Sequence, residues 1–144
     1  KYQVIWHTGK KKYGVFLNSC TGYKNIIVYD FIEKMNFAYS AADLVISRSG
    51  AIAISEICFL QKCSILIPSP HVSENHQFKN AMSLEKNGAC LIVEQKNIEK
   101  ELVLKIKSLL NNKKIRLQIS EKAKEQSIND SSHKIVQLVE RNIK

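Results

Sequence analysis

Blocks of apolar residues separated by polar segments run along the chain and predict an alternation of strands and helices. A short apolar run with polar residues on both sides is typical of a strand that is buried on both faces of a parallel sheet. We expect strands at residues 2–7, 25–29, 43–47, 64–67 and 89–93.

Apolar residues at helical spacing occupy much of the remaining chain. They predict helices at residues 33–42, 51–60, 76–86, 116–126 and 132–143, the third of them ended by Asn87-Gly88. A further helix begins at Ile98, with an apolar stripe of Ile98, Leu102, Val103, Ile106, Leu109 and Leu110. We expect polar loops at residues 8–12 and 68–75. The predicted architecture is a doubly wound α/β layer with helical packing at its C-terminal end.

Residues 42–80 contain the part of the pattern that points to a ligand. A strand, a tight turn, a short helix, a second strand and a long polar loop follow one another there. Such a βαβ unit places both loops at the same edge of a parallel sheet. Ligands of open α/β sheets bind at that edge.

The tight turn Arg48-Ser49-Gly50 has the composition of an anion site. Ser49 and Gly50 stand where a helix N-cap belongs, and glycine lets the backbone approach a ligand closely. The N–H groups of Ala51 and Ile52 would then face outward at the positive end of the helix dipole. We expect this helix end to seat a phosphate.

Glu56 is the one charged residue between Ala51 and Leu60, a helix that we expect to be otherwise buried. A carboxylate in that position needs hydrogen-bond donors, and the vicinal hydroxyls of a sugar would supply two. The alternative is that Glu56 pairs with Arg48 or a lysine and that the turn only caps the helix.

The loop after the 64–67 strand leads into a second polar group. His76 and Asn80 have the spacing that places two side chains on one face of a helix, and Gln77 lies beside His76. Imidazole and amide groups suit ligands rich in hydroxyl groups. Alternatively, these residues are ordinary loop and capping groups.

Composition and charge narrow the class of protein. With 144 residues, 44% of them hydrophobic, the chain can bury one core and should form one domain.

The net charge of +9 comes from the segments before Arg48 (+3) and after Gln95 (+6), whereas the segment between them is neutral. A nucleic-acid reader would concentrate basic and aromatic residues on its recognition element, so we do not expect a nucleic-acid partner. The basic excess fits a solvated face or, more weakly, attraction to anionic lipid headgroups.

Cysteine and histidine spacing argues against a metal site. The chain has no CxxC pair, and Cys58, Cys63 and Cys90 lie in apolar segments, as reduced core residues of a cytosolic protein would. His7, His71, His76 and His133 do not lie at zinc spacing with them. We expect no signal peptide and no membrane-spanning segment.

The stretches RSGAIAISE and PSPHVSENHQFKNAMSLEKNGA resemble the C-terminal half of the MurG family of N-acetylglucosaminyltransferases, and the resemblance covers nearly the whole chain. It implies one of two Rossmann-like domains that face each other across a cleft, the GT-B arrangement, with this half holding the UDP-sugar. It also implies transfer of N-acetylglucosamine (GlcNAc) from UDP-GlcNAc to the lipid-linked muramoyl-pentapeptide lipid I. The product is lipid II, used in peptidoglycan synthesis.

The family's donor-site residues carry over onto matching positions. Ile32 matches the position whose backbone reads uracil, and Glu56 matches the carboxylate that holds the ribose hydroxyls. The turn and helix start beside the diphosphate correspond to Arg48, Ser49, Gly50, Ala51 and Ile52. The polar trio near the sugar corresponds to His76, Gln77 and Asn80, where His76 replaces the glutamine of some relatives.

The chain begins with Lys1 and a strand follows at once, so it looks like the back part of a longer protein. The family's glycine-rich loop and its N-terminal acceptor domain have no counterpart here, and we assign no catalytic base. The resemblance implies an inverting reaction without a cofactor, on the cytoplasmic face of the bacterial inner membrane, with peripheral attachment. The only aspartates are Asp30, Asp43 and Asp130, so no DxD pair exists to hold a metal on the diphosphate. Two alternatives stay open: a stand-alone donor-binding subunit of another GT-B N-acetylglucosaminyltransferase, and a non-catalytic nucleotide-binding domain.

Overall fold

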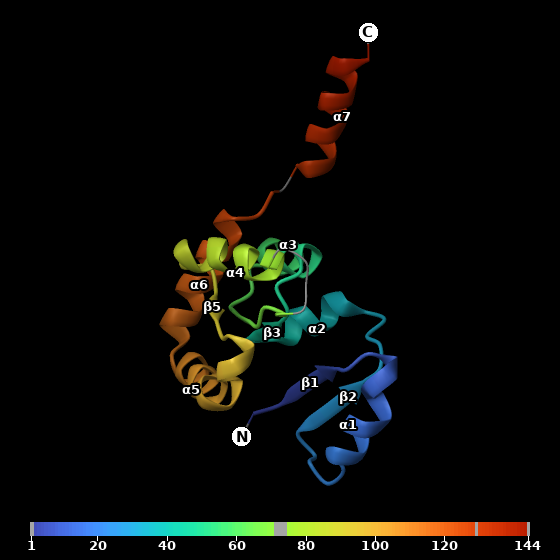
Figure 1. Cartoon of the computed structure of the whole chain (residues 1–144), viewed down its shortest axis with the longest axis vertical. Helices are drawn as coiled ribbons and strands as arrows, with labels where there is room; N and C mark the ends of the chain where they lie inside the picture. The colour runs from blue at the N-terminus through green and yellow to red at the C-terminus, as the bar shows by residue number, and fades with distance from the viewer. Residues whose placement is uncertain (1, 71–74, 129, 144) are drawn as a thin grey trace. The chain divides into compact units, whose positions relative to one another are not determined.

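The computed structural model describes residues 2–70, 75–128 and 130–143, and the chain divides into two compact units, Lys1–Ala41 and Ala42–Lys144 (Figure 1). Residues 71–74 of the expected 68–75 loop, His71 among them, lie outside the described residues. Both units contain parallel β-structure with helical connections, as the sequence predicts.

The first unit is built on two parallel strands. Strand β1 (Val4–His7) pairs with β2 (Ile26–Tyr29) in a register that joins Val4 to Ile26 and His7 to Tyr29. The connection holds a 3-10 turn, η1 (Lys10–Lys12), and helix α1 (Tyr13–Ser19), and helix α2 (Met35–Ala41) follows β2. This is one βαβ crossover followed by a further helix.

The prediction of a polar loop at 8–12 is wrong in part, and the sequence pattern misses α1. Lys10–Lys12 forms the 3-10 turn, which runs directly into α1. Helix α1 has only seven residues, and Val15 and Leu17 are 67% and 43% exposed, so no apolar stripe marks it. The helix contacts β1 through the ring of Phe16, whose centroid lies 4.4 Å from that of the Trp6 ring.

The second unit contains a three-stranded parallel sheet in the order β3-β4-β5. The strands are β3 (Val45–Ser47), β4 (Ser64–Leu66) and β5 (Leu91–Ile92), each a little shorter than predicted. Helix α3 (Ala51–Phe59) joins β3 to β4, and α4 (His76–Lys86) precedes β5. A 3-10 turn, η3 (Gln95–Asn97), leads into α5 (Ile98–Asn111), which is followed by α6 (Lys113–Glu125) and α7 (Ser131–Asn142).

The core of the second unit lies where the sheet meets α5 and α6. Its buried centre consists of Cys63, Ile65, Val93, Leu109 and Ile119. The predicted α5 stripe is confirmed for Ile98, Leu102, Ile106 and Leu109, which all lie in or against this cluster. It is wrong for Val103, which is 55% exposed because it projects from the other side of the helix.

Helix α3 is less buried than predicted. Only Ile57 and Cys58 are fully buried, whereas Ile52 and Phe59 are 79% and 61% exposed. The physical reason is geometric, since a helix that packs on one neighbouring layer buries one side, and here α3 packs against α6. An apolar sequence therefore does not imply that the whole helix is enclosed.

The cysteines behave as expected for a core of reduced thiols. Cys58, Cys63 and Cys90 are free and buried, and Cys20 is free and half-buried. Burial raises the pKa of Cys63 to about 11, although nearby Arg116 opposes the shift. Burial, together with the charge of Glu85, raises the pKa of Cys90 to about 12, and burial also raises the pKa of Cys58.

Two findings concern the described residues as a whole. None of their helices combines the length and the apolar character needed to cross a membrane. Within the same residues, no group of three or more His, Cys, Asp or Glu side chains is arranged to hold a metal ion.

We expect Leu109→Ala to lower the free energy of unfolding by about 2–5 kcal/mol, because it opens a cavity in the buried cluster. The matched control is Leu104→Ala on the same helix, where Leu104 is 67% exposed and the cost should stay below about 1 kcal/mol. Urea unfolding followed by circular dichroism measures both. Equal losses for the two variants would contradict the assigned core.

We expect a thiol reagent at about pH 8 to modify Cys20 in the folded protein and the three buried thiols only after unfolding. Burial also links two of these thiols to folding, because the pKa of Cys63 is raised to about 11 and that of Cys90 to about 12. The folding free energy gained from keeping them protonated is fully present below their usual pKa of 9.0 and is lost as the pH rises through these higher values. Time-resolved labelling with a chromogenic disulfide, with Cys20→Ser as control, measures the accessibility. Rapid modification of a second thiol in the folded protein would contradict the prediction.

Candidate functional site

The N-terminal end of α3 lies at the turn where the sequence predicts a helix start. Gly50 is the N-cap residue, with extended backbone angles of φ −68° and ψ 148°, and among the described residues no side chain caps this helix end. The carbonyl of Gly50 accepts the N–H of Ile54 at 3.0 Å, which starts the helical ladder. The amides of Ala51 and Ile52 precede that ladder.

Gly50 is not required by the backbone or by packing. Its φ of −68° is available to any residue, and an added Cβ atom would meet no atom of the described residues within 4 Å, its two chain neighbours aside. The position therefore leaves room for the close approach of a ligand that glycine permits, besides the preference of a helix N-cap for glycine over alanine.

An open hollow of about 520 Å³ lies at this helix end. It gathers six residues predicted from the sequence together with Ala53, in the first turn of α3, which the sequence reasoning missed. The lining residues are Arg48, Gly50, Ala51, Ile52, Ala53, Glu56 and Gln77. Backbone amides, a guanidinium, a carboxylate and an amide side chain thus border one space, a combination suited to a phosphorylated polar ligand.

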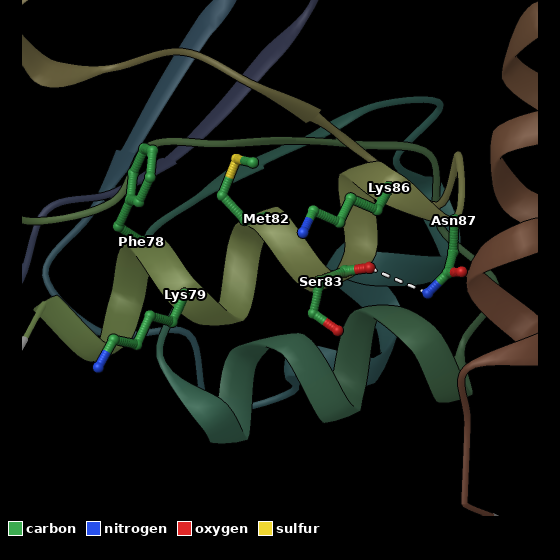
Figure 2. Close-up of a pocket in the computed structure, with 6 residues that line it drawn as sticks. All are labelled: Phe78, Lys79, Met82, Ser83, Lys86 and Asn87. Carbon is green, nitrogen blue, oxygen red and sulfur yellow. Dashed lines mark hydrogen bonds between the residues drawn. The ribbon is translucent and has the colours of Figure 1, made fainter.

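Ser49 does not cap the helix, contrary to the simplest interpretation of the turn. Its side chain is fully buried, and its hydroxyl donates to the backbone carbonyl of Gln77 at 2.8 Å. Because Gly50 occupies the N-cap position, the Ser49 side chain points into the protein towards α4. Figures 1 and 2 show α3 and α4 side by side in this unit.

Arg48 ties the turn to the segment after β4. One guanidinium nitrogen donates to the carbonyls of Ile67 and Pro68, at 3.1 and 3.3 Å. Arg48 also lines the hollow, so the residue combines a structural bond with a positive charge beside the helix end.

Glu56 lines the same hollow and is exposed. The expectation that it is a single charge in a buried helix is wrong, because α3 is buried on one side only. Its exposure places the carboxylate where a ligand from solvent can reach it.

The first turn of α4 has its amide groups fixed in defined orientations. The Gln77 side-chain oxygen accepts the backbone N–H of Ser69 at 2.9 Å, and the Asn80 side-chain nitrogen donates to the carbonyl of Ser49 at 3.4 Å. Gln77 therefore offers its NH₂ group as a donor, and Asn80 offers its oxygen as an acceptor. His76, the third predicted residue, is exposed at the first position of α4.

Ile32 belongs to the other unit, in the segment between β2 and α2, and is half-buried. In that segment the backbone N–H of Phe31 is held by the carboxylate of Asp30 at 2.8 Å. The assignment of Ile32 to base recognition stays a prediction.

A second hollow, of about 530 Å³, lies along α4 and is lined by Phe78, Lys79, Met82, Ser83, Lys86 and Asn87. Figure 2 shows these side chains on α4 and at its end, where the Asn87 amide donates to the Ser83 carbonyl at 2.9 Å. It holds none of the predicted residues. Similar volume does not decide between the two hollows, whereas the convergence of polar groups from three segments favours the one at α3.

Comparisons with known proteins agree with the fold. The sequence pattern of the glycosyltransferase family 28 C-terminal domain matches residues 1–136. A crystal structure of MurG from Acinetobacter baumannii superimposes with a TM-score of 0.86 at 26% identity, over 96% of this chain and 41% of that one. The predicted α/β fold of a GT-B C-terminal half is confirmed.

Two curated relatives bear the name UDP-N-acetylglucosamine–N-acetylmuramyl-(pentapeptide) pyrophosphoryl-undecaprenol N-acetylglucosamine transferase. The one from Parabacteroides distasonis is 48% identical over 103 residues, which are 70% of this chain and 28% of that protein. The one from Caldanaerobacter subterraneus is 40% identical over 146 residues, which are 96% of this chain and 40% of that protein. The chain thus spans well under half the length of these relatives, and the resemblance stated from the motifs is confirmed: it belongs to the glycosyltransferase family 28 C-terminal domain family.

Proposed function

We propose that this chain is the donor-binding part of an inverting N-acetylglucosaminyltransferase and that UDP-GlcNAc binds in the hollow at the start of α3. The observation that carries the proposal is that no side chain of the described residues caps this helix end, whose N-cap is a glycine with open space around it. The printed names of the relatives, which are UDP-N-acetylglucosamine-dependent transferases, supply the donor.

The diphosphate would rest on the amides of Ala51 and Ile52, with the Arg48 guanidinium at its side. Negative charge builds on UDP as the bond from the anomeric carbon to the phosphate oxygen breaks. The positive end of the α3 dipole stabilises that charge. We assign this stabilisation to the helix end and Arg48, which both line the hollow.

Glu56 would hold the ribose. It follows Ile52 by four residues, which is one helical turn, or about 6 Å along the axis at 1.5 Å per residue. That separation matches the step from a diphosphate to the adjoining ribose hydroxyls. A carboxylate can accept hydrogen bonds from two vicinal hydroxyls at once.

The sugar would lie against the first turn of α4. There the Gln77 amide donates and the Asn80 oxygen accepts, so the pair can bind a hydroxyl or acetamido group of GlcNAc from both sides. His76, exposed beside them, would add a further polar contact.

The acceptor is the second substrate of the proposed reaction. Its hydroxyl attacks the anomeric carbon from the side opposite UDP, and the configuration inverts. From the relatives' names, we propose the lipid-linked muramoyl-pentapeptide as acceptor and lipid II as product, in peptidoglycan synthesis. In a protein as long as these relatives, residues beyond the matched part would bind the acceptor and take its proton. The site of action would be the cytoplasmic face of the bacterial inner membrane, with peripheral attachment.

We expect calorimetry to show that UDP binds to the 144-residue chain and that Glu56→Ala weakens this binding by about 1–3 kcal/mol, the scale of a hydrogen bond to a charged group. The control is Glu121→Ala, which removes an exposed carboxylate from α6 and should leave the affinity unchanged. Absence of binding by the unmodified chain would overturn the proposed function. Equal affinity in Glu56→Ala would remove only the ribose assignment.

We expect Ala51→Pro to weaken UDP binding by about 1–3 kcal/mol while leaving uridine binding unchanged. Proline at the first helical position removes one N–H without disturbing the helix, and the extended conformation of Gly50 suits a residue before proline. Ala51→Ser keeps the N–H and serves as control. If UDP and uridine lose affinity equally, the Ala51 amide does not bind the diphosphate.

A further inference from the structure

Ser49 is one of two fully buried polar residues in the described chain, and it links two segments that are distant in the sequence. Its hydroxyl donates to the Gln77 carbonyl at 2.8 Å across 28 positions. Its own carbonyl accepts the Asn80 side-chain nitrogen at 3.4 Å. A single residue of the β3–α3 turn thus contacts the first turn of α4 through both its side chain and its backbone.

Further bonds join the same turn to the segment after β4. Arg48 donates to the carbonyls of Ile67 and Pro68, and the Ser69 N–H donates to the side chain of Gln77. Three segments are therefore cross-linked at one sheet edge, and the contact between the turn and the α4 backbone depends on the Ser49 hydroxyl.

We propose that Ser49 is a positioning residue that fixes the sugar-binding amides of α4 relative to the phosphate-binding end of α3. The inference rests on the proposed function, since it assigns the diphosphate to α3 and GlcNAc to Gln77 and Asn80. Ser49 itself is fully enclosed, so it acts through these neighbours without touching the ligand.

A positioning role for Ser49 predicts a difference between two ligands that a general contribution to stability would not produce. In the proposed site the diphosphate and ribose of UDP would contact α3, whereas the sugar of UDP-GlcNAc would also contact α4. Loss of the Ser49 hydroxyl leaves the Gln77 carbonyl without its partner and frees the first turn of α4 to shift. Binding of the sugar-bearing ligand then weakens more than binding of UDP.

The chain offers a matched control. Ser64 is also fully buried, at the start of β4, but among the described residues its hydroxyl has no hydrogen-bond partner. Ser64→Ala therefore removes a buried hydroxyl of the same kind without breaking a bond between the two helices.

The test measures the dissociation constants of UDP and UDP-GlcNAc by calorimetry for the unmodified chain, Ser49→Ala and Ser64→Ala. We expect Ser49→Ala to weaken UDP-GlcNAc binding about tenfold, which corresponds to 1.4 kcal/mol, and to change UDP binding by less than about twofold. Ser64→Ala should change neither constant by more than about twofold. The ratio of the two constants does not depend on the fraction of protein that is folded.

The outcomes separate the two proposals. If the unmodified chain binds neither ligand, the proposed function fails and this inference falls with it. If it binds both and Ser49→Ala weakens them equally, or weakens neither, the positioning role is overturned while the proposed function stands. Should Ser49→Ala fail to fold, Ser49→Cys, with a weaker donor of similar shape, replaces it. An unchanged ratio in Ser49→Cys overturns the role, and a smaller shift in the same direction supports it.

Discussion

Parallel pairing of β3 with β4 is the constraint on which the candidate site depends. The register joins Val45 to Ser64 and Ser47 to Leu66, so both strands end at the same level. The turn that follows β3 and the segment that follows β4 must then emerge side by side. The hydrogen bonds from Arg48 to the Ile67 and Pro68 carbonyls show how short the remaining distance is. An antiparallel pair would have sent the two segments to opposite ends of the sheet.

The same pairing explains why a short, mostly apolar helix can present polar chemistry. Helix α3 is held on one side by α6, and its other side, with Ile52 and Glu56, is exposed beside the hollow. In the part of the chain that the structure describes, no side chain caps this helix end, and Ser49, the serine beside the N-cap, is bonded to α4. One side of α3 thus packs against the protein, and the other side carries the groups proposed to bind the ligand.

Much of this could be predicted from the sequence. Continuous apolar runs and clear stop signals predicted the five strands and the helices α2 to α7. They could do so because the tertiary packing of these elements agrees with the local pattern of apolar and polar residues. Most residues around the hollow were also predicted, because turn chemistry and spacing are local properties. Helix α1 was missed, since it has seven residues and no apolar stripe, and its contact between Phe16 and Trp6 joins separate elements. The bond from Ser49 to Gln77 was missed for a related reason: a cap and a cross-link look identical in sequence, and only the position of α4 distinguishes them.

The conformation of Gly50 and the open space beside it bear on what a side chain at this position would do. Its backbone lies in a region open to every amino acid, and an added Cβ atom would meet no atom of the described residues within 4 Å, its chain neighbours aside. Alanine at that position would reduce the freedom of the unfolded chain at no steric cost to the fold. Against that gain stands the preference of a helix N-cap for glycine over alanine, so position 50 serves both the start of α3 and the room left for a ligand at the turn.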